Sequence, residues 1–218
     1  MQNSHSTSWL NNHYMWIING FLFLFLFFAF LAPVLMKYDY VIPAKIIYQI
    51  YQFLCHQLAF RSWFLFGEQA YYPRGLAGIQ NINTYEIITG TNSLDLESAR
   101  QFIGNSYVGF KVAFCQRDVA IYGSLLLMGI FFQISGKKLH ALPWYLWVIV
   151  GLLPIGIDGT TQFGGLGISF LSWLPVREST PMLRTITGAL FGFTTGLFLF
   201  PLIEETMVWP NSKKLLDK

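Results

Sequence analysis

The run from Trp16 to Leu35, WIINGFLFLFLFFAFLAPVL, contains no charged residue and constrains the fold more than any other feature of the sequence. A helix needs about 20 apolar residues to cross the roughly 30 Å hydrocarbon core of a bilayer. The whole chain is 54% hydrophobic and only 11% charged, whereas soluble domains carry about 25% charged residues. The sequence therefore predicts an integral membrane protein in which residues 16–35 form the first span.

Three further apolar runs predict three more spans. They cover residues 119–134, 142–157 and 183–203. The first two of these are short, so we expect them to include flanking residues or to stand nearly upright in the bilayer. The predicted fold class is all-α: one polytopic domain over residues 1–218, with about four transmembrane helices, in the cell membrane.

The predicted topology places both termini on one side of the membrane. Short segments with paired lysines, at residues 137–138 and 213–214, favour the cytoplasm for that side, because such segments resist translocation whereas long loops do not. The other side receives residues 68–110, which are punctuated by Gly, Asn and one Pro. This composition predicts an extramembrane insertion.

Residues 41–58 predict an amphipathic helix rather than a fifth span. Lys45, Gln49, Gln52 and His56 recur at spacings of four, three and four, so they share one helical face. Isoleucine, phenylalanine and leucine occupy the opposite face. A helix of this kind is typical of the membrane interface.

The two cysteines of the chain both lie beside ionisable residues. Cys55 is followed by His56, and Cys115 lies three residues before Asp118. These four residues are a possible zinc ligand set, although neighbours on a helix such as Cys55 and His56 diverge by about 100°. A disulfide between Cys55 and Cys115 would suit an oxidising compartment. Two free buried thiols are the third alternative, and the sequence leaves all three open.

A polar pocket is predicted at one membrane face, where the second span begins, the third ends and the fourth begins. Ionisable groups close to hydrocarbon are costly and tend to be paired or functional. The candidate residues of this pocket are Gln57, Arg61, Arg117, Tyr122, Asp158, Gln162 and Arg184. We expect Asp158 to pair with Arg184 or Arg117. Each of these residues also has a simpler explanation when it is taken alone. The arginines could extend to the lipid headgroups, and the aspartates could cap a helix or form a turn.

Four motifs, taken in order, resemble a family of uncharacterised prokaryotic membrane proteins catalogued as domain of unknown function 2085. They are CHQLAFRSWFLFGEQ from Cys55, CQRDVAIYGSLLL from Cys115, PIGIDGTTQFGGLGIS from Pro154 and LRTITGALFGFTTG from Leu183. Two features depart from the family pattern, which has a cysteine where this chain has Asp118 and a shorter segment between the first two motifs. If the family binds a metal, Asp118 would replace a thiolate here. The resemblance implies a fold and no activity.

The last predicted span carries Gly188, Gly192 and Gly196 at intervals of four. Such a stripe lets another helix approach closely, either within the bundle or from a partner subunit. The first span is aromatic on all sides, which suits contact with membrane lipid, another protein, or a hydrophobic cofactor such as a quinone or carotenoid.

Two classes of function follow from these features. The favoured one is a non-catalytic accessory subunit of a larger membrane complex, with other membrane-protein subunits as partners. The alternative is a metal- or thiol-dependent enzyme acting on a lipid or isoprenoid-phosphate headgroup, in which arginines bind the anion and Asp118 or Asp158 acts as general base. No known catalytic motif such as HExxH or a P-loop is present, so catalytic residues are not assigned. No nucleic-acid partner is expected.

Overall fold

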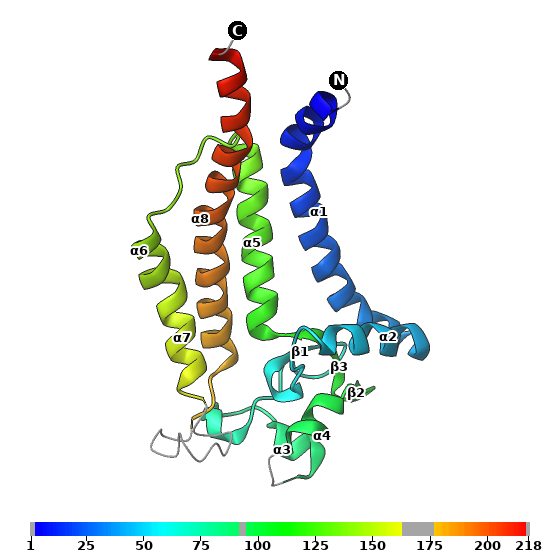
Figure 1. Cartoon of the computed structure of the whole chain (residues 1–218). Coiled ribbons are helices and arrows are strands. Elements are labelled where there is room, and N and C mark those ends of the chain that lie inside the picture. Colours follow the sequence, from blue (N-terminus) through cyan, green and yellow to red (C-terminus); the bar gives the residue numbers. More distant parts are fainter. Residues whose placement is uncertain (1–2, 92–94, 163–176, 217–218) are drawn as a thin grey trace.

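The computed structural model describes residues 3–91, 95–162 and 177–216, and the middle of the predicted loop between residues 158 and 182 lies outside them. Long helices run side by side, with a small mixed unit at one end (Figure 1). The helices are α1 (Asn3–Lys37), α2 (Val41–Gln52), α3 (Tyr85–Thr89), α4 (Leu96–Gln101), α5 (Gln116–Ile134), α6 (Trp144–Leu146), α7 (Leu153–Thr160) and α8 (Pro181–Leu216). The 3-10 turns are η1 (Ala59–Arg61) and η2 (Gly75–Ala77), η3 (Trp147–Leu152) is a π-helical turn, and the strands are β1 (Ser62–Leu65), β2 (Gly104–Asn105) and β3 (Gly109–Cys115).

Within the described residues, three helices are long and apolar enough to cross a membrane. They are Asn12–Lys37 of α1, α5, and Pro181–Met207 of α8. The run Trp144–Thr160, formed by α6, η3 and α7, is a shorter apolar helix that lies alongside α8 (Figure 1). A predominantly helical membrane fold is therefore confirmed, whereas the fourth span stays a prediction.

The chain passes up and down the bundle. The first residues of α1 and the last residues of α8 lie at one end, and the small unit lies at the other (Figure 1). The end of α1, the start of α5, the end of α7 and the start of α8 consequently meet beside that unit. This arrangement brings the predicted pocket residues to one end of the bundle.

The glycine stripe of α8 packs against α5 within the same chain. A Cβ atom at Gly192 would lie 2.2 Å from the carbonyl oxygen of Ile121, and one at Gly188 would lie 2.7 Å from that of Arg117. A Cβ at Gly196 would lie 2.8 Å from Cγ of Met128. The stripe therefore packs inside the bundle, which was the first of the two alternatives that the sequence left open.

The prediction of an all-α fold is incomplete, because three strands within residues 62–115 form an antiparallel sheet with strand order β1-β3-β2. Strand β3 pairs Lys111 with Phe64 and Cys115 with Ser62. Val112, Ala113 and Phe114 are all buried, so the strand lacks the alternation that identifies a strand exposed on one face. Strand β3 leads directly into α5, and this junction fixes Cys115 at the end of the bundle.

Helix α2 is shorter than predicted, since it ends at Gln52 rather than residue 58. It lies crosswise to α1 at the end of that helix (Figure 1). Tyr48 and Tyr51 face the protein core, and Ile46, Ile50 and Phe53 are exposed. Cys55 and His56 lie in the turn after α2 and not in the helix itself. The argument that neighbours on a continuous helix diverge by about 100° therefore does not apply to them.

Candidate functional site

A cavity of about 200 Å³ lies where α5 and α8 begin and the turn after α2 crosses them. Its lining includes two thiols, one carboxylate and three guanidinium groups. The lining residues are Leu54, Cys55, His56, Gln57, Leu58, Arg61, Cys115, Arg117, Asp118 and Arg184. Three separate segments thus contribute arginines to one hollow: η1 gives Arg61, α5 gives Arg117 and α8 gives Arg184.

The two thiols and Asp118 form a compact cluster. Their ligand atoms all lie within 4.8 Å of one another, and the Cys115 thiol donates to the Asp118 carboxylate at 3.1 Å. Both cysteines are free thiols, so the predicted disulfide is not supported. The hydrogen bond with Cys115, burial and the negative charge of Asp118 together raise the pKa of Cys55.

Backbone amides point at both sulfur atoms. The Gln57 N–H donates to Sγ of Cys55 and the Asp118 N–H donates to Sγ of Cys115, each at 3.5 Å. Gln57 adopts a positive φ of 50°, an uncommon conformation for a residue other than glycine. Cys115 is the N-cap of α5, so its sulfur also lies at the positive end of the helix dipole.

A buried carboxylate that the sequence analysis missed, Glu178, holds two of the cavity arginines. It accepts from Nε of Arg61 at 2.9 Å and forms an ion pair with Arg184. The side chains of Glu178 and Arg184 are 4% and 2% exposed. Arg74 lies 4.0 Å away on the same carboxylate. Glu178 is therefore shared among three guanidinium groups.

The predicted pairing of Asp158 is confirmed with Arg117, whose Nη2 lies 2.5 Å from the carboxylate. Asp158 is buried, and Arg177 approaches its other oxygen to 3.5 Å. Gln162 donates to Asp158 and accepts from Arg184 at 3.3 Å. Asp158 and Gln162 thus lie behind the cavity arginines, and Arg184 reaches Asp158 only through Gln162.

Two predicted site residues lie apart from the cluster. His56 lines the cavity but is exposed and is not within ligand distance of the thiols. Tyr122 does not line the cavity and instead stacks on Phe114, with ring centroids 5.4 Å apart. The predicted four-ligand set of Cys55, His56, Cys115 and Asp118 is thus reduced to three by the geometry.

Lys111 is the second buried ionisable residue that the sequence analysis did not place in the site. Its ammonium group donates to the carbonyl oxygens of Gln57 at 2.9 Å and Arg100 at 2.5 Å. Burial lowers the pKa of Lys111 to about 7. Because Lys111 ties β3 to the turn that carries Cys55, it helps to hold the cluster in position.

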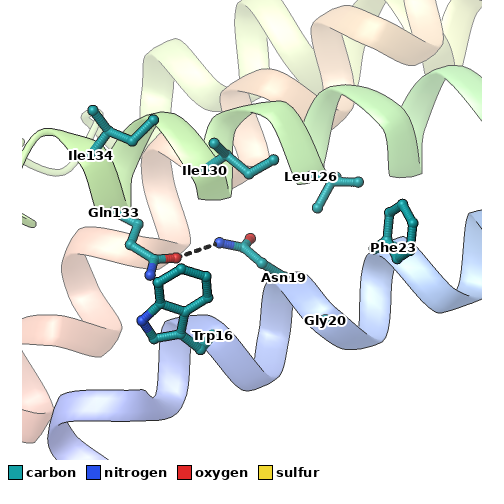
Figure 2. A pocket seen from close by; sticks show the side chains of 8 residues that line it. All are labelled: Trp16, Asn19, Gly20, Phe23, Leu126, Ile130, Gln133 and Ile134. Atoms are coloured by element: carbon teal, nitrogen blue, oxygen red, sulfur yellow. Dashed lines mark hydrogen bonds between the residues drawn. The ribbon is translucent and has the colours of Figure 1, made fainter.

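A second hollow, of about 620 Å³, lies between α1 and α5 far from the thiols. Figure 2 shows Asn19 of α1 and Gln133 of α5 pointing toward each other across it, joined by a hydrogen bond of 3.0 Å. The other lining residues are Trp16, Gly20, Phe23, Leu126, Ile130 and Ile134. Asn19 therefore supplies a polar contact in a helix that the sequence analysis described as aromatic on all sides.

Comparison with known proteins supports the family resemblance. A family model described as predicted membrane protein, domain of unknown function 2085, matches residues 100–198, a range that includes Cys115, Asp118, Asp158 and Arg184 but not Cys55. An uncharacterized protein of Methanocaldococcus jannaschii is 27% identical over 214 residues, which cover 94% of this chain and all of that protein. No solved structure matches this chain.

Proposed function

We propose that this protein is a membrane protein that binds a phosphate-type anion, either a lipid headgroup or a free ion, in the cavity at the end of its helical bundle. One observation carries the proposal: three arginines from three separate elements line one cavity, and Asp118 is the single carboxylate among the described residues that line it. Guanidinium groups are well suited to phosphate because they present paired donors in a plane.

Partial exposure of two of these arginines supports a binding role. The side chains of Arg61 and Arg117 are 20% and 23% exposed, whereas that of Arg184 is nearly fully buried. A ligand entering the cavity would therefore meet Arg61 and Arg117 first. Arg184 would supply positive charge from beneath, held in place by Glu178 and Gln162.

An unsatisfied donor supports the same role. The Nε atom of Arg117 is buried and has no hydrogen-bond partner among the described residues. A buried donor without an acceptor costs about 1 to 3 kcal/mol. An anion bound against Arg117 would give that donor an acceptor. In an arginine with a purely structural role, the unpaired donor would be a cost with no compensation.

Binding of inorganic phosphate to the full-length protein in detergent tests the proposal. We expect phosphate to raise the thermal midpoint of the wild type, and Arg61→Gln and Arg117→Gln each to weaken binding by roughly tenfold or more, the loss of one charge-assisted contact. Lys138→Gln, an equal charge loss at an exposed residue just beyond the C-terminal end of α5, is the matched control and should leave binding unchanged.

Nanodiscs distinguish the two sources of the phosphate group. If the ligand is a lipid headgroup, anionic lipids should co-purify with the wild type and be depleted in Arg61→Gln, and free phosphate should compete poorly. If the ligand is a free ion, phosphate should bind equally well in nanodiscs of zwitterionic lipid. The proposal would be refuted if neither free phosphate nor anionic lipid changed the thermal midpoint of the wild type.

The accessory-subunit prediction stays a prediction. The glycine stripe on which a partner seam would depend faces α5, so the insertion and the exposed aromatic face of α1 are the surfaces left for partner contacts in this prediction. Gentle purification from the native membrane, followed by identification of co-migrating subunits, checks it. Anion binding is the function that the geometry supports best, because it rests on a built cavity.

A further inference from the structure

We infer that Cys55, Cys115 and Asp118 bind a zinc ion through two thiolates and one carboxylate oxygen. The cluster is assembled from segments sixty residues apart in sequence, the turn after α2 and the junction of β3 with α5. Its ligand atoms lie within 4.8 Å of one another. Cysteine sulfur with a carboxylate oxygen is a donor set that zinc accepts.

The distances need only a small adjustment. With bonds of about 2.0 to 2.3 Å, the ligand atoms of a tetrahedral zinc site lie about 3.3 to 3.8 Å apart. Atoms that already lie within 4.8 Å would have to close by roughly 1 Å, which rotation of short side chains can supply. The site is therefore close to formed without any movement of the helices.

Backbone donors reach both sulfur atoms and would stabilise them as thiolates when a metal ion replaces their protons. Each sulfur accepts a backbone N–H, from Gln57 for Cys55 and from Asp118 for Cys115. The amide of Gln57 reaches Cys55 while its own residue is held at a positive φ, and uncommon backbone conformations of this kind cluster at functional sites.

Three protein ligands leave one tetrahedral position for water or substrate, which is the pattern of zinc sites that react or exchange. All three ligand residues line the cavity, so the open position has room to be filled from it. Binding is balanced by proton release: each thiol loses its proton to solvent, two Zn–S bonds form, and the metal keeps its oxidation state.

Cobalt and zinc titrations of the full-length protein, purified in detergent and treated with a chelator, test the inference. We expect one Co²⁺ per chain with a thiolate-to-cobalt charge-transfer band, and loss of the band when Zn²⁺ displaces it. Cys55→Ser and Cys115→Ser should each weaken Zn²⁺ binding by more than about 100-fold, exceeding the effect of losing an outer-shell partner.

Matched variants separate ligands from neighbours. Asp118→Asn should weaken binding by at least about tenfold, whereas Glu86→Gln, a carboxylate outside the cavity lining, should keep the wild-type affinity. His56→Ala should also keep it. If a cysteine variant fails to fold, protection of the wild-type thiols from alkylation by added Zn²⁺ gives the same answer without mutation.

Three results would overturn the inference: no charge-transfer band in the wild type, a band that survives both cysteine changes, or a Cys55–Cys115 disulfide in the protein as isolated. The inference stands apart from anion binding. Phosphate binding is measured without metal, and cobalt binding is measured without phosphate, so failure of one leaves the other intact.

Discussion

Replacing Glu178 with glutamine should lower stability and raise anion affinity at the same time. Glu178 neutralises Arg184, whose side chain is only 2% exposed, and it also pairs with Arg61. Removing one partner of a buried ion pair costs about 3 to 5 kcal/mol, since the remaining charge is left uncompensated. Arg61 is partly exposed and can turn to water, so most of that cost comes from Arg184.

The same change should make the cavity a better anion site. An anion and Glu178 on opposite sides of one guanidinium group would lie about 6 Å apart, and at an effective dielectric constant of about 20 their repulsion is about 3 kcal/mol. Solvent in the partly open cavity reduces this repulsion to about half, and about 1.4 kcal/mol is tenfold in affinity. We therefore expect Glu178→Gln to bind phosphate about tenfold more tightly.

Thermal melting in detergent, with and without phosphate, measures both effects. Glu178→Gln should melt well below the wild type without phosphate, and phosphate should restore more of the loss than it adds to the wild type. Glu86→Gln is the control, because Glu86 lies 3.5 Å from Arg74 with a side chain 27% exposed and should change little. A variant that is less stable and also binds phosphate more weakly would refute the reasoning.

Three further changes test the packing, the ion pair and the buried lysine. Gly192→Ala, whose Cβ would lie 2.2 Å from a backbone oxygen of α5, should cost about 1 to 3 kcal/mol by thermal melting, whereas Gly123→Ala, with no atom within 4 Å, should be neutral or stabilising. Asp158→Asn and Arg117→Gln should be non-additive in a double-mutant cycle by about 1 to 3 kcal/mol, and additive losses would show that the pair does not couple. Burial lowers the pKa of Lys111 to about 7 from 10.5, so between those values the unfolded chain binds more protons and stability should rise with pH, by at most about 1.4 kcal/mol per pH unit. Lys111→Met should flatten that rise, and an unchanged slope in melts from pH 7 to 9 would contradict it.

The sequence predicted which ends of the helices meet, because alternating spans leave few arrangements. That logic correctly brought Arg117, Asp158 and Arg184 to one end of the bundle. It could not decide the partner of Asp158, since the choice between two arginines depends on helix rotation. The side-chain geometry shows that Arg117 pairs with it and that Arg184 pairs with Glu178.

The remaining features of the fold and the site depend on contacts between distant segments, which no local sequence pattern encodes. Strand β3 was missed because all its central residues are buried, so its period of two is absent. Glu178 was missed because its importance comes from being buried among guanidinium groups, although an acidic residue just before a membrane span was a usable signal. His56 was included because it adjoins Cys55, yet in the turn after α2 it is exposed and lies outside the ligand group.

Charge balance makes the relation between the two proposed ligands informative. Two neutral thiols and the Asp118 carboxylate carry a charge of −1, and a zinc ion bound by two thiolates and that carboxylate carries −1 as well. Zinc binding therefore leaves the net charge of the cavity unchanged, and by charge alone phosphate affinity should be the same with and without the metal. Coupling of more than about tenfold, which must be reciprocal between the two ligands, would require a phosphate oxygen to fill the open position on zinc. Paired titrations of the wild type and Cys55→Ser with phosphate, each with and without zinc, would thus distinguish two neighbouring sites from a single metal-assisted one.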